Sequence, residues 1–174
     1  MARALARFAQ GVSALSGAAG RAASWLYPLL VAVLLVNVTL RYGLGLGALA
    51  LEELQWHLFA AAFLLGFAWV ESEDGHVRVD LLRERLPRRV RAAVDLAGSL
   101  LLLFPFAVIV AVSAWDFAWQ SWLLGERSPL PSGLPARWVP KGVLAVALSL
   151  LALQALASAA RSAAALARPR SEGG

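Results

Sequence analysis

Few side chains in this sequence could carry chemistry. The chain has two histidines, His57 and His76, and no cysteine, which excludes disulfides, thiolate catalysis and cysteine-ligated metal sites. We place the two histidines on opposite sides of the membrane span described below, where they cannot form a shared haem or two-histidine metal site. Asn37, His57 and Gln154 are polar residues within otherwise apolar segments, where such groups commonly form hydrogen bonds between helices. The sequence therefore predicts no catalytic residue, no metal site and no cofactor.

Four uncharged windows of membrane-spanning length contain or flank these residues. Hydrophobic residues make up 60% of the 174 residues, and charged residues 16%, against about 25% in soluble domains. A 19-residue helix is about 28 Å long, close to the ~30 Å hydrocarbon core of a bilayer. The uncharged windows are residues 22–40, 54–70, 96–115 and 142–160.

These windows predict an all-α integral membrane protein with four transmembrane helices and no soluble domain. We expect a membrane domain over residues 22–162 and a disordered tail over residues 163–174. The predicted helices are about 22–41, 52–71, 92–116 and 139–161.

The distribution of basic residues predicts the topology. Twelve of the sixteen lie before the first helix, between the second and third, or after the fourth. The other connections hold only Arg41, Arg127, Arg137 and Lys141. By the positive-inside rule both termini and the central connection are expected in the cytoplasm. This accounts for the net charge of +5 without nucleic-acid binding, since no basic run is interleaved with aromatic residues.

Two segments outside the helices have mixed character. Within residues 1–21, apolar side chains recur at helical spacing, which fits either a short interfacial helix on the cytoplasmic surface or an unstructured lead. Between His76 and Pro87, aliphatic and charged residues alternate. We expect that segment to lie along the cytoplasmic interface, with Asp80 capping or salt-bridging locally.

Some residues at the helix ends and interiors bear on packing. Arg41 ends the first helix and Glu52 and Glu53 open the second after a loop of ten residues, so all three are expected near one interface. The sequence leaves two alternatives. Arg41 forms a charge pair with Glu52 or Glu53, or the charges are solvated separately. Pro105 should kink the third helix or break its local hydrogen bonding. Small residues spaced four apart in the fourth helix permit close helix approach, at Ala145/Ser149 and Ala155/Ala159.

The order of several short motifs resembles the small membrane (Q) subunit, or small permease, of tripartite ATP-independent periplasmic (TRAP) transporters. The resemblance covers about residues 22–160 and rests on an arginine ending helix one, Glu-Glu-Leu opening helix two, a glycine midway, a His-aliphatic-x-Val-Asp element, a Leu-Pro, and a Leu-Gln pair in helix four. In this sequence those are Arg41, Glu52-Glu53-Leu54, Gly66, His76-Val77-Arg78-Val79-Asp80, Leu86-Pro87 and Leu153-Gln154. The candidate structural or partner-contact residues are accordingly Arg41, Glu52, Glu53, Gly66, His76, Arg78, Asp80, Pro87 and Gln154.

The resemblance implies a transport role and no enzymatic activity. In such systems a periplasmic solute-binding protein delivers an organic acid or related solute to the large membrane (M) subunit. That subunit moves the solute by an elevator-type motion driven by a sodium gradient. The small subunit scaffolds the large one without binding solute. Its expected partners are the large subunit, the periplasmic protein and membrane lipid, in the inner membrane of a bacterium or archaeon.

Two other classes stay open from the sequence alone. A membrane anchor of a respiratory enzyme would need haem-ligating histidines within helices or a quinone pocket, and His57 is the single histidine inside a predicted helix. An independent small transporter would need a polar stripe through the membrane, which the four windows do not offer.

Overall fold

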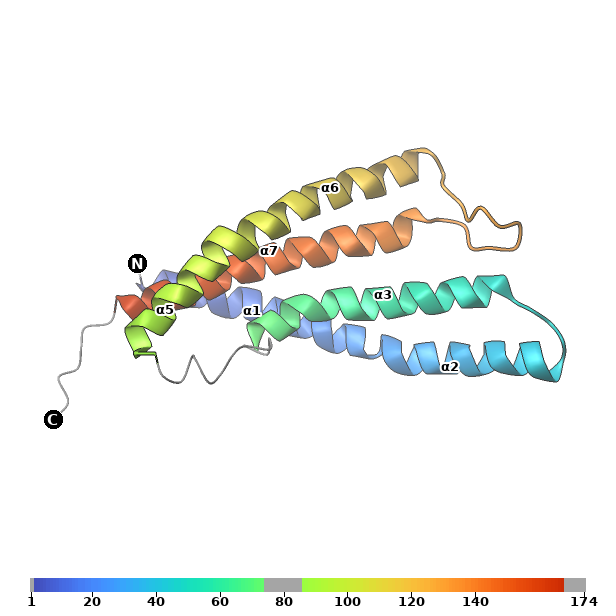
Figure 1. Cartoon of the computed structure of the whole chain (residues 1–174), viewed down its shortest axis with the longest axis horizontal. Coiled ribbons are helices and arrows are strands. Elements are labelled where there is room, and N and C mark those ends of the chain that lie inside the picture. The colour runs from blue at the N-terminus through green and yellow to red at the C-terminus, as the bar shows by residue number, and fades with distance from the viewer. Residues whose placement is uncertain (1, 74–85, 168–174) are drawn as a thin grey trace.

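The computed structural model of the chain describes residues 2–73 and 86–167. Regular structure in that part of the chain is entirely helical (Figure 1). In chain order the helices are α1 (Ala2–Ser24), α2 (Leu26–Val38), the π-helix η1 (Thr39–Gly43), α3 (Leu49–Ser72), α5 (Arg88–Ala97), the π-helix η2 (Gly98–Leu103), α6 (Phe104–Leu123) and α7 (Trp138–Leu166).

These helices join into four apolar spans, each long and apolar enough to cross a membrane. Each span contains one of the four uncharged windows. The prediction of an all-helical protein with four membrane helices is therefore confirmed. The spans are Ala4–Gly43, Leu49–Ser72, Arg88–Leu123 and Trp138–Leu166.

All four spans extend beyond the predicted helices, the first and third by the most. The fourth continues to Leu166, so the first residues of the predicted disordered tail are helical. The predicted boundaries stopped near charged residues, but the helix continues through Arg7, Arg21 and Arg91. Charged residues are compatible with a helix that leaves the hydrocarbon, since their heads can reach water while their stems cover apolar surface. At 1.5 Å per residue, the 40-residue first span is about 60 Å long, roughly twice the hydrocarbon thickness.

The N-terminal segment forms the packed helix α1, which contacts both α3 and α7. Ala9, Ser16 and Ala23, spaced seven apart, are buried on its inner side. Gly20 permits the close approach to α3, because a Cβ added there would lie 2.5 Å from the Cβ of Trp69. A turn at Trp25 is the one interruption between α1 and α2. Of the two alternatives for this segment, the structure shows a helix, and it lies along the bundle.

Helix α7 is the centre of the bundle, since it contacts α1, α3, α5 and α6. Its buried side is built mainly from alanine, and the facing side of α6 is also small, which lets the two backbones approach closely. Among the predicted small pairs, Ala145, Ala155 and Ala159 are buried. Ser149 accepts a hydrogen bond from the Trp115 indole at 3.1 Å. The buried alanines of α6 are Ala107, Ala111, Ala114 and Ala118.

Pro105 is the second residue of α6, which begins where the π-helix η2 ends. A proline removes one backbone donor, and a π-helical segment is one way for the helix to accommodate the missing bond. The predicted change in local hydrogen bonding at Pro105 is therefore confirmed.

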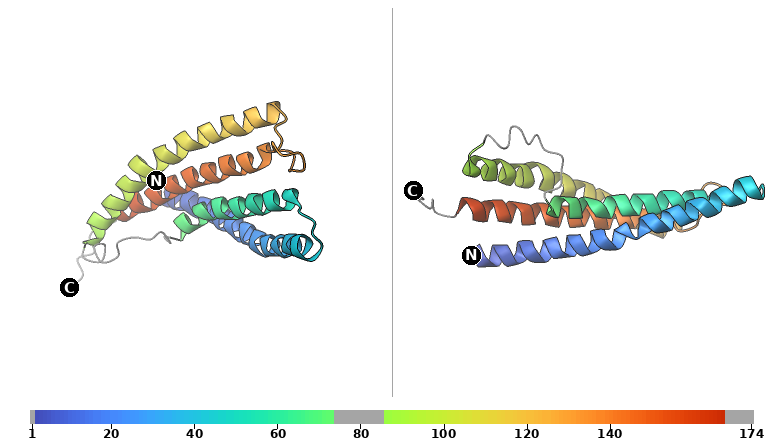
Figure 2. Two further views of the ribbon diagram at one scale, coloured as in Figure 1. Left: turned by 45° about the vertical axis from the view of Figure 1, so that its right-hand side comes forward. Right: turned by 90° about the horizontal axis from the view of Figure 1, so that it is seen from below.

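The two ends of the bundle differ in what they contain. The start of α1, the start of α5 and the end of α7 lie at one end, and the α2–α3 and α6–α7 connections lie at the other (Figures 1 and 2). We call these the terminal end and the loop end. Five tryptophans line two cavities of the loop-end half, namely Trp56, Trp115, Trp119, Trp122 and Trp138.

Candidate functional site

At the loop end, the guanidinium of Arg41 pairs with the carboxylate of Glu52. The Nη1–Oε1 distance is 2.7 Å, and the side chains of Arg41 and Glu52 are 56% and 38% exposed. Arg41 lies in η1 and Glu52 in the first turn of α3, so the pair joins the two helices of the hairpin across their short connection. Of the two acids that the sequence offers to Arg41, the structure selects Glu52.

Glu53 points instead to the connection between α6 and α7. Its Oε1 accepts a hydrogen bond from the Ser128 hydroxyl at 2.5 Å, and its Oε2 accepts one from the Leu134 amide at 2.7 Å. The Arg137 guanidinium lies 3.5 Å from the same carboxylate, and the Glu53 side chain is only 14% exposed. Glu52 therefore bonds across the α2–α3 hairpin, and Glu53 bonds to the α6–α7 connection.

The α6–α7 connection is also closed by its own bonds. The Arg137 amide donates to the Glu126 carbonyl and the Ser128 amide to the Leu134 carbonyl, each at 3.1 Å. Lys141 forms an ion pair with Glu126, and its ammonium also lies 3.7 Å from the centre of the Phe117 ring. The hydrogen bond from Lys141, together with the charges of Lys141 and Arg137, holds the pKa of Glu126 below its ordinary value.

We call the following set the loop-end cluster: Arg41, Glu52, Glu53, Glu126, Ser128, Leu134, Arg137 and Lys141. It ties both connections to the start of α3 and to each other. Sequence reasoning found Arg41 and the two acids. It missed Ser128 and the Leu134 amide, because the sequence of a loop does not show which helix end the loop will contact.

At the terminal end, Gln154 of α7 is fully buried against α1. Its Oε1 accepts a hydrogen bond from the Ser16 hydroxyl at 3.1 Å, and its Nε2 donates to Ser13 at 3.3 Å. Ser16 is also fully buried. Gln154 thus forms hydrogen bonds between helices, which is the role that the sequence favoured for it.

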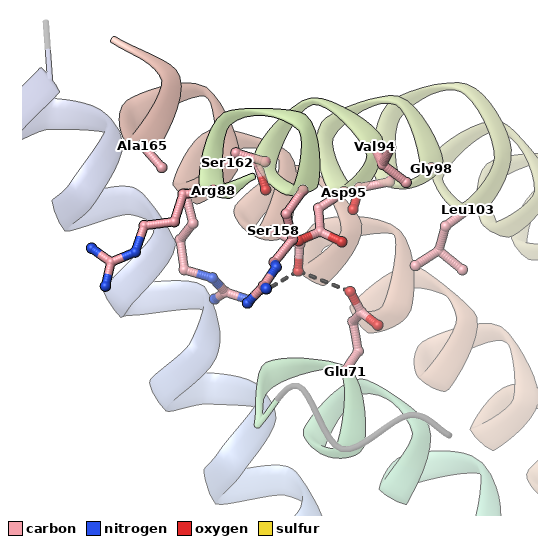
Figure 3. Close-up of a pocket in the computed structure, with 13 residues that line it drawn as sticks. Glu71, Arg88, Val94, Asp95, Gly98, Leu103, Ser158, Ser162 and Ala165 are labelled. Carbon is pink, nitrogen blue, oxygen red and sulfur yellow. Dashed lines mark hydrogen bonds between the residues drawn. The ribbon is translucent and has the colours of Figure 1, made fainter. Parts of the chain in front are cut away.

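Two more residues of α7 extend this network to α3. Arg161 donates to Ser13 at 2.8 Å and to Ser158 at 2.9 Å. The Ser158 hydroxyl in turn donates to the buried carboxylate of Glu71 at 2.9 Å (Figure 3). The terminal-end cluster is therefore Ser13, Ser16, Glu71, Gln154, Ser158 and Arg161, and it joins α1, α3 and α7. Sequence reasoning missed all of these except Gln154.

The other predicted site residues are distributed along the chain. A Cβ added at Gly66, in α3, would meet no atom of this chain within 4 Å. Pro87 stands at the N-cap position of α5. His76, Arg78 and Asp80 lie outside the described residues, together with most of the segment between His76 and Pro87.

The two remaining polar residues lie in the loop-end half of the hairpin. His57 lines a cavity of about 300 Å³ beside Glu53, Arg137 and Lys141. Asn37 is buried on α2, and its Oδ1 has no hydrogen-bond partner among the described residues. Within residues 2–73 and 86–167, no group of three potential metal-ligating side chains occurs. The arrangement holds helices and loops together and presents no catalytic constellation in the described part of the chain.

Comparison with known protein families decides the class. Residues 30–165 match the family model described as tripartite ATP-independent periplasmic transporters, DctQ component. The chain belongs to the DctQ family. The resemblance found in the motifs is thus confirmed, and the protein is a membrane component of this class of transporter.

A curated relative of this DctQ protein gives the same assignment. It comes from Haemophilus influenzae, carries the provisional name TRAP transporter small permease protein, and is 30% identical over 99 residues. The matched stretch covers 57% of this chain and 62% of the relative, less than two thirds of its length. No solved structure matches this chain.

The family match also divides the terminal-end cluster. Glu71, Gln154, Ser158 and Arg161 fall within residues 30–165, whereas Ser13 and Ser16 of α1 precede them. The cluster residues on α3 and α7 therefore belong to the part of the chain that matches the DctQ family, and those on α1 lie outside that part.

Proposed function

We propose that this DctQ protein is the scaffold for the large membrane subunit of a sodium-coupled TRAP transporter. In this proposal the transporter takes up an organic acid or related solute, delivered by a periplasmic solute-binding protein, across a bacterial or archaeal inner membrane. The single observation that carries the scaffolding role is the placement of charge. Each of the four spans contains an uncharged window, and the charged members of both clusters lie outside these windows.

This placement argues against a solute or sodium site within the chain. An organic anion and its coupling ion need converging carboxylates, backbone carbonyls from unwound helices or a cationic clamp near the midplane. The described polar contacts instead join helices and loops of this chain to one another. The ion pairs lie near the helix ends, and neutral groups such as Gln154 form the contacts farther inside. Those contacts give a rigid body, which is what a scaffold requires.

The α2–α3 hairpin provides the surface that we assign to the large subunit. α2 contacts α1, η1 and α3, and its outward apolar side chains are about half exposed, including Val31, Leu35 and Val36. Gly66 on α3 has open space beside it. A glycine with no neighbour in its own chain is suited to close contact with a helix of another chain.

The orientation in the membrane is part of the proposal. The positive-inside rule supports a cytoplasmic terminal end, because twelve of the sixteen basic residues precede the first predicted helix, lie between the second and third, or follow the fourth in the sequence. Since the chain has no cysteine, single cysteines can report the sidedness. A cysteine at Ser132 should react with an impermeant thiol reagent in intact spheroplasts, and one at Gly11 only after permeabilisation. The reverse pattern would contradict this orientation.

The transport role is tested by reconstitution. Uptake into vesicles should require this chain, the large subunit, the periplasmic protein and an inward sodium gradient. We expect no flux through this chain alone. Solute flux without the large subunit, or full uptake with this chain left out, would reject the scaffold role.

The proposed contact surface has its own test. Gly66→Leu should lower the yield of complex with the large subunit while leaving the thermal stability of the isolated chain unchanged. Gly11→Leu is the matched control, since Gly11 also has open space beside it but lies on α1. Equal complex yield for both variants would remove α3 from the interface.

A further inference from the structure

A cavity of about 590 Å³ lies at the terminal end, where α3 ends and α5 begins. Its walls come from α3, α5, η2 and α7 (Figure 3). Figure 3 shows Glu71 and Ser158 joined by their hydrogen bond, with Asp95 close by, and Arg88 extending away from them from the first turn of α5. Glu71, Ser158 and Arg161 of the terminal-end cluster line this cavity. The contacts of that cluster with α1 do not require an open space there.

The charge of the cavity is cationic by one unit among the described residues. Three guanidinium groups line it, from Arg88 and Arg91 on α5 and Arg161 on α7. Two carboxylates oppose them, from Glu71 and Asp95. Three positive charges less two negative charges leave +1. A phosphodiester carries a single negative charge and accepts the forked hydrogen bonds that guanidinium groups donate.

The lining of the cavity combines polar and apolar side chains. Serine hydroxyls and charged groups lie beside the apolar side chains of Val94 and Leu103. The uncharged windows of the second and fourth spans end at residues 70 and 160, and the next charged residues are Glu71 and Arg161. The cavity therefore lies at the level where hydrocarbon gives way to headgroups, with an apolar wall continuing toward the membrane interior.

We propose that this cavity binds the phosphodiester of an anionic phospholipid, such as phosphatidylglycerol. The three arginines bind the phosphate, and Val94 and Leu103 contact the start of one acyl chain. The first turn of α5 supports this assignment: it has no acidic residue, and the N-cap Pro87 provides no side-chain hydrogen bond. Cationic side chains at a helix start are unfavourable beside the positive end of the helix dipole, and a bound anion offsets that repulsion. Sodium coupling and transport play no part in this inference.

Native mass spectrometry of the full-length chain in neutral detergent tests the proposal. Phosphatidylglycerol should bind more tightly than phosphatidylethanolamine, which carries a compensating ammonium. Arg88→Gln should weaken phosphatidylglycerol binding about fivefold, and Arg88→Gln with Arg91→Gln about twenty-five-fold. Arg89→Gln is the matched control, because Arg89 adjoins Arg88 but does not line the cavity. It should leave the affinity unchanged.

Further measurements separate a lipid site from diffuse charge attraction and from a site for a soluble anion. Arg88→Lys keeps the charge and should retain most of the affinity, and the helix content of each variant by circular dichroism must equal that of the parent. Equal affinities for the two phospholipids would overturn the anionic preference. Equal losses in Arg88→Gln and Arg89→Gln would show diffuse attraction and no site. Displacement of phosphatidylglycerol by millimolar inorganic phosphate would assign the cavity to a soluble anion and reject the lipid.

Discussion

The two ends of the bundle are held together by different kinds of polar contact. The loop-end cluster is made of ion pairs and charge-assisted hydrogen bonds, some of them solvent-exposed, such as Arg41–Glu52 at 2.7 Å. The terminal-end cluster is made mostly of neutral groups, of which Ser16 and Gln154 are fully buried. The contacts of the loop end hold the connections between helices, and those of the terminal end hold α1 against the rest of the bundle.

The difference follows from the cost of removing each group from water. Exposed ion pairs gain little because water already solvates both charges. A buried hydroxyl or amide group cannot bond to water when its partner is removed. The loss of a partner therefore costs more unfolding free energy at a buried polar group than at an exposed ion pair. The terminal end should therefore respond more strongly to single substitutions than the exposed Arg41–Glu52 pair does.

The largest effect is expected at Gly20, where α1 meets α3. Gly20→Val would place its Cβ 2.5 Å from the Cβ of Trp69, so the two helices must separate. Overpacking of this kind costs about 1–3 kcal/mol of unfolding free energy. Thermal unfolding in detergent should show a lower Tm for Gly20→Val and an unchanged Tm for Gly11→Val, which meets open space. A Tm equal to that of the parent in Gly20→Val would mean that α1 does not pack there.

The next effect is expected at Glu53, and it sharpens the contrast with its neighbour. Glu53→Ala removes the acceptor for the Ser128 hydroxyl and the Leu134 amide and the partner of Arg137. Hydrogen exchange across residues 126–136 should quicken clearly. Glu52→Ala loses one exposed pair and should change stability by no more than about 1 kcal/mol, with exchange in that loop unaffected. Equal effects of the two substitutions would contradict the different bonding partners that we assign to Glu52 and Glu53.

A smaller loss is expected from Gln154→Leu, which removes two hydrogen bonds to α1. Hydrogen bonds between membrane helices contribute about 0.6 kcal/mol each on average, so the expected cost is about 1 kcal/mol. Exchange should increase at residues 9–16 of α1 and stay constant in the loops. Gln154→Glu is the companion variant, since it keeps the acceptor for Ser16. Faster exchange at the loop end alone would place the role of Gln154 elsewhere.

The smallest effect is the pH dependence of the loop end. Because the pKa of Glu126 is lowered in the folded chain, its contribution to stability is fully present above the ordinary value of 4.5. That contribution is lost as the pH falls below 4.5 through the lowered pKa. Tryptophan fluorescence should follow this loss, since the Trp122 and Trp138 rings lie 4.6 Å apart beside the loop. The Glu53 carboxylate also accepts hydrogen bonds from this connection, so its protonation contributes to the same loss. Glu126→Gln should therefore reduce the amplitude of the transition, and an unchanged amplitude would show that Glu126 does not contribute to it.

The spans could be predicted from the sequence because each leaves an uninterrupted uncharged run. The candidate site was only partly predictable. Arg41 and the Glu52–Glu53 pair were visible because charges next to an apolar run mark a boundary. Gln154 was visible because an amide interrupts an apolar window.

The remaining residues gave no such signal. Ser13, Ser16 and Ser158 lie among alanines, where a buried serine looks like any small residue. Their importance depends on which helix faces them, and helical periodicity does not specify a neighbour. Glu71 follows directly after an apolar window, where a charged residue is expected to reach water, yet it is only 5% exposed. The hydrogen bond from Ser158 of α7 offsets part of the cost of its burial.

The near-continuity of α1 and α2 has a mechanical consequence. The first span is a rod of about 60 Å that contacts α7 near one end and continues to the Arg41 pair at the other. A tilt change of about 10° around its midpoint would displace each tip by about 5 Å, by the length of the rod alone. Membranes of different thickness alter the tilt of such helices. Bilayer thickness would therefore be transmitted along this rod as strain on the hydrogen bonds of Gln154.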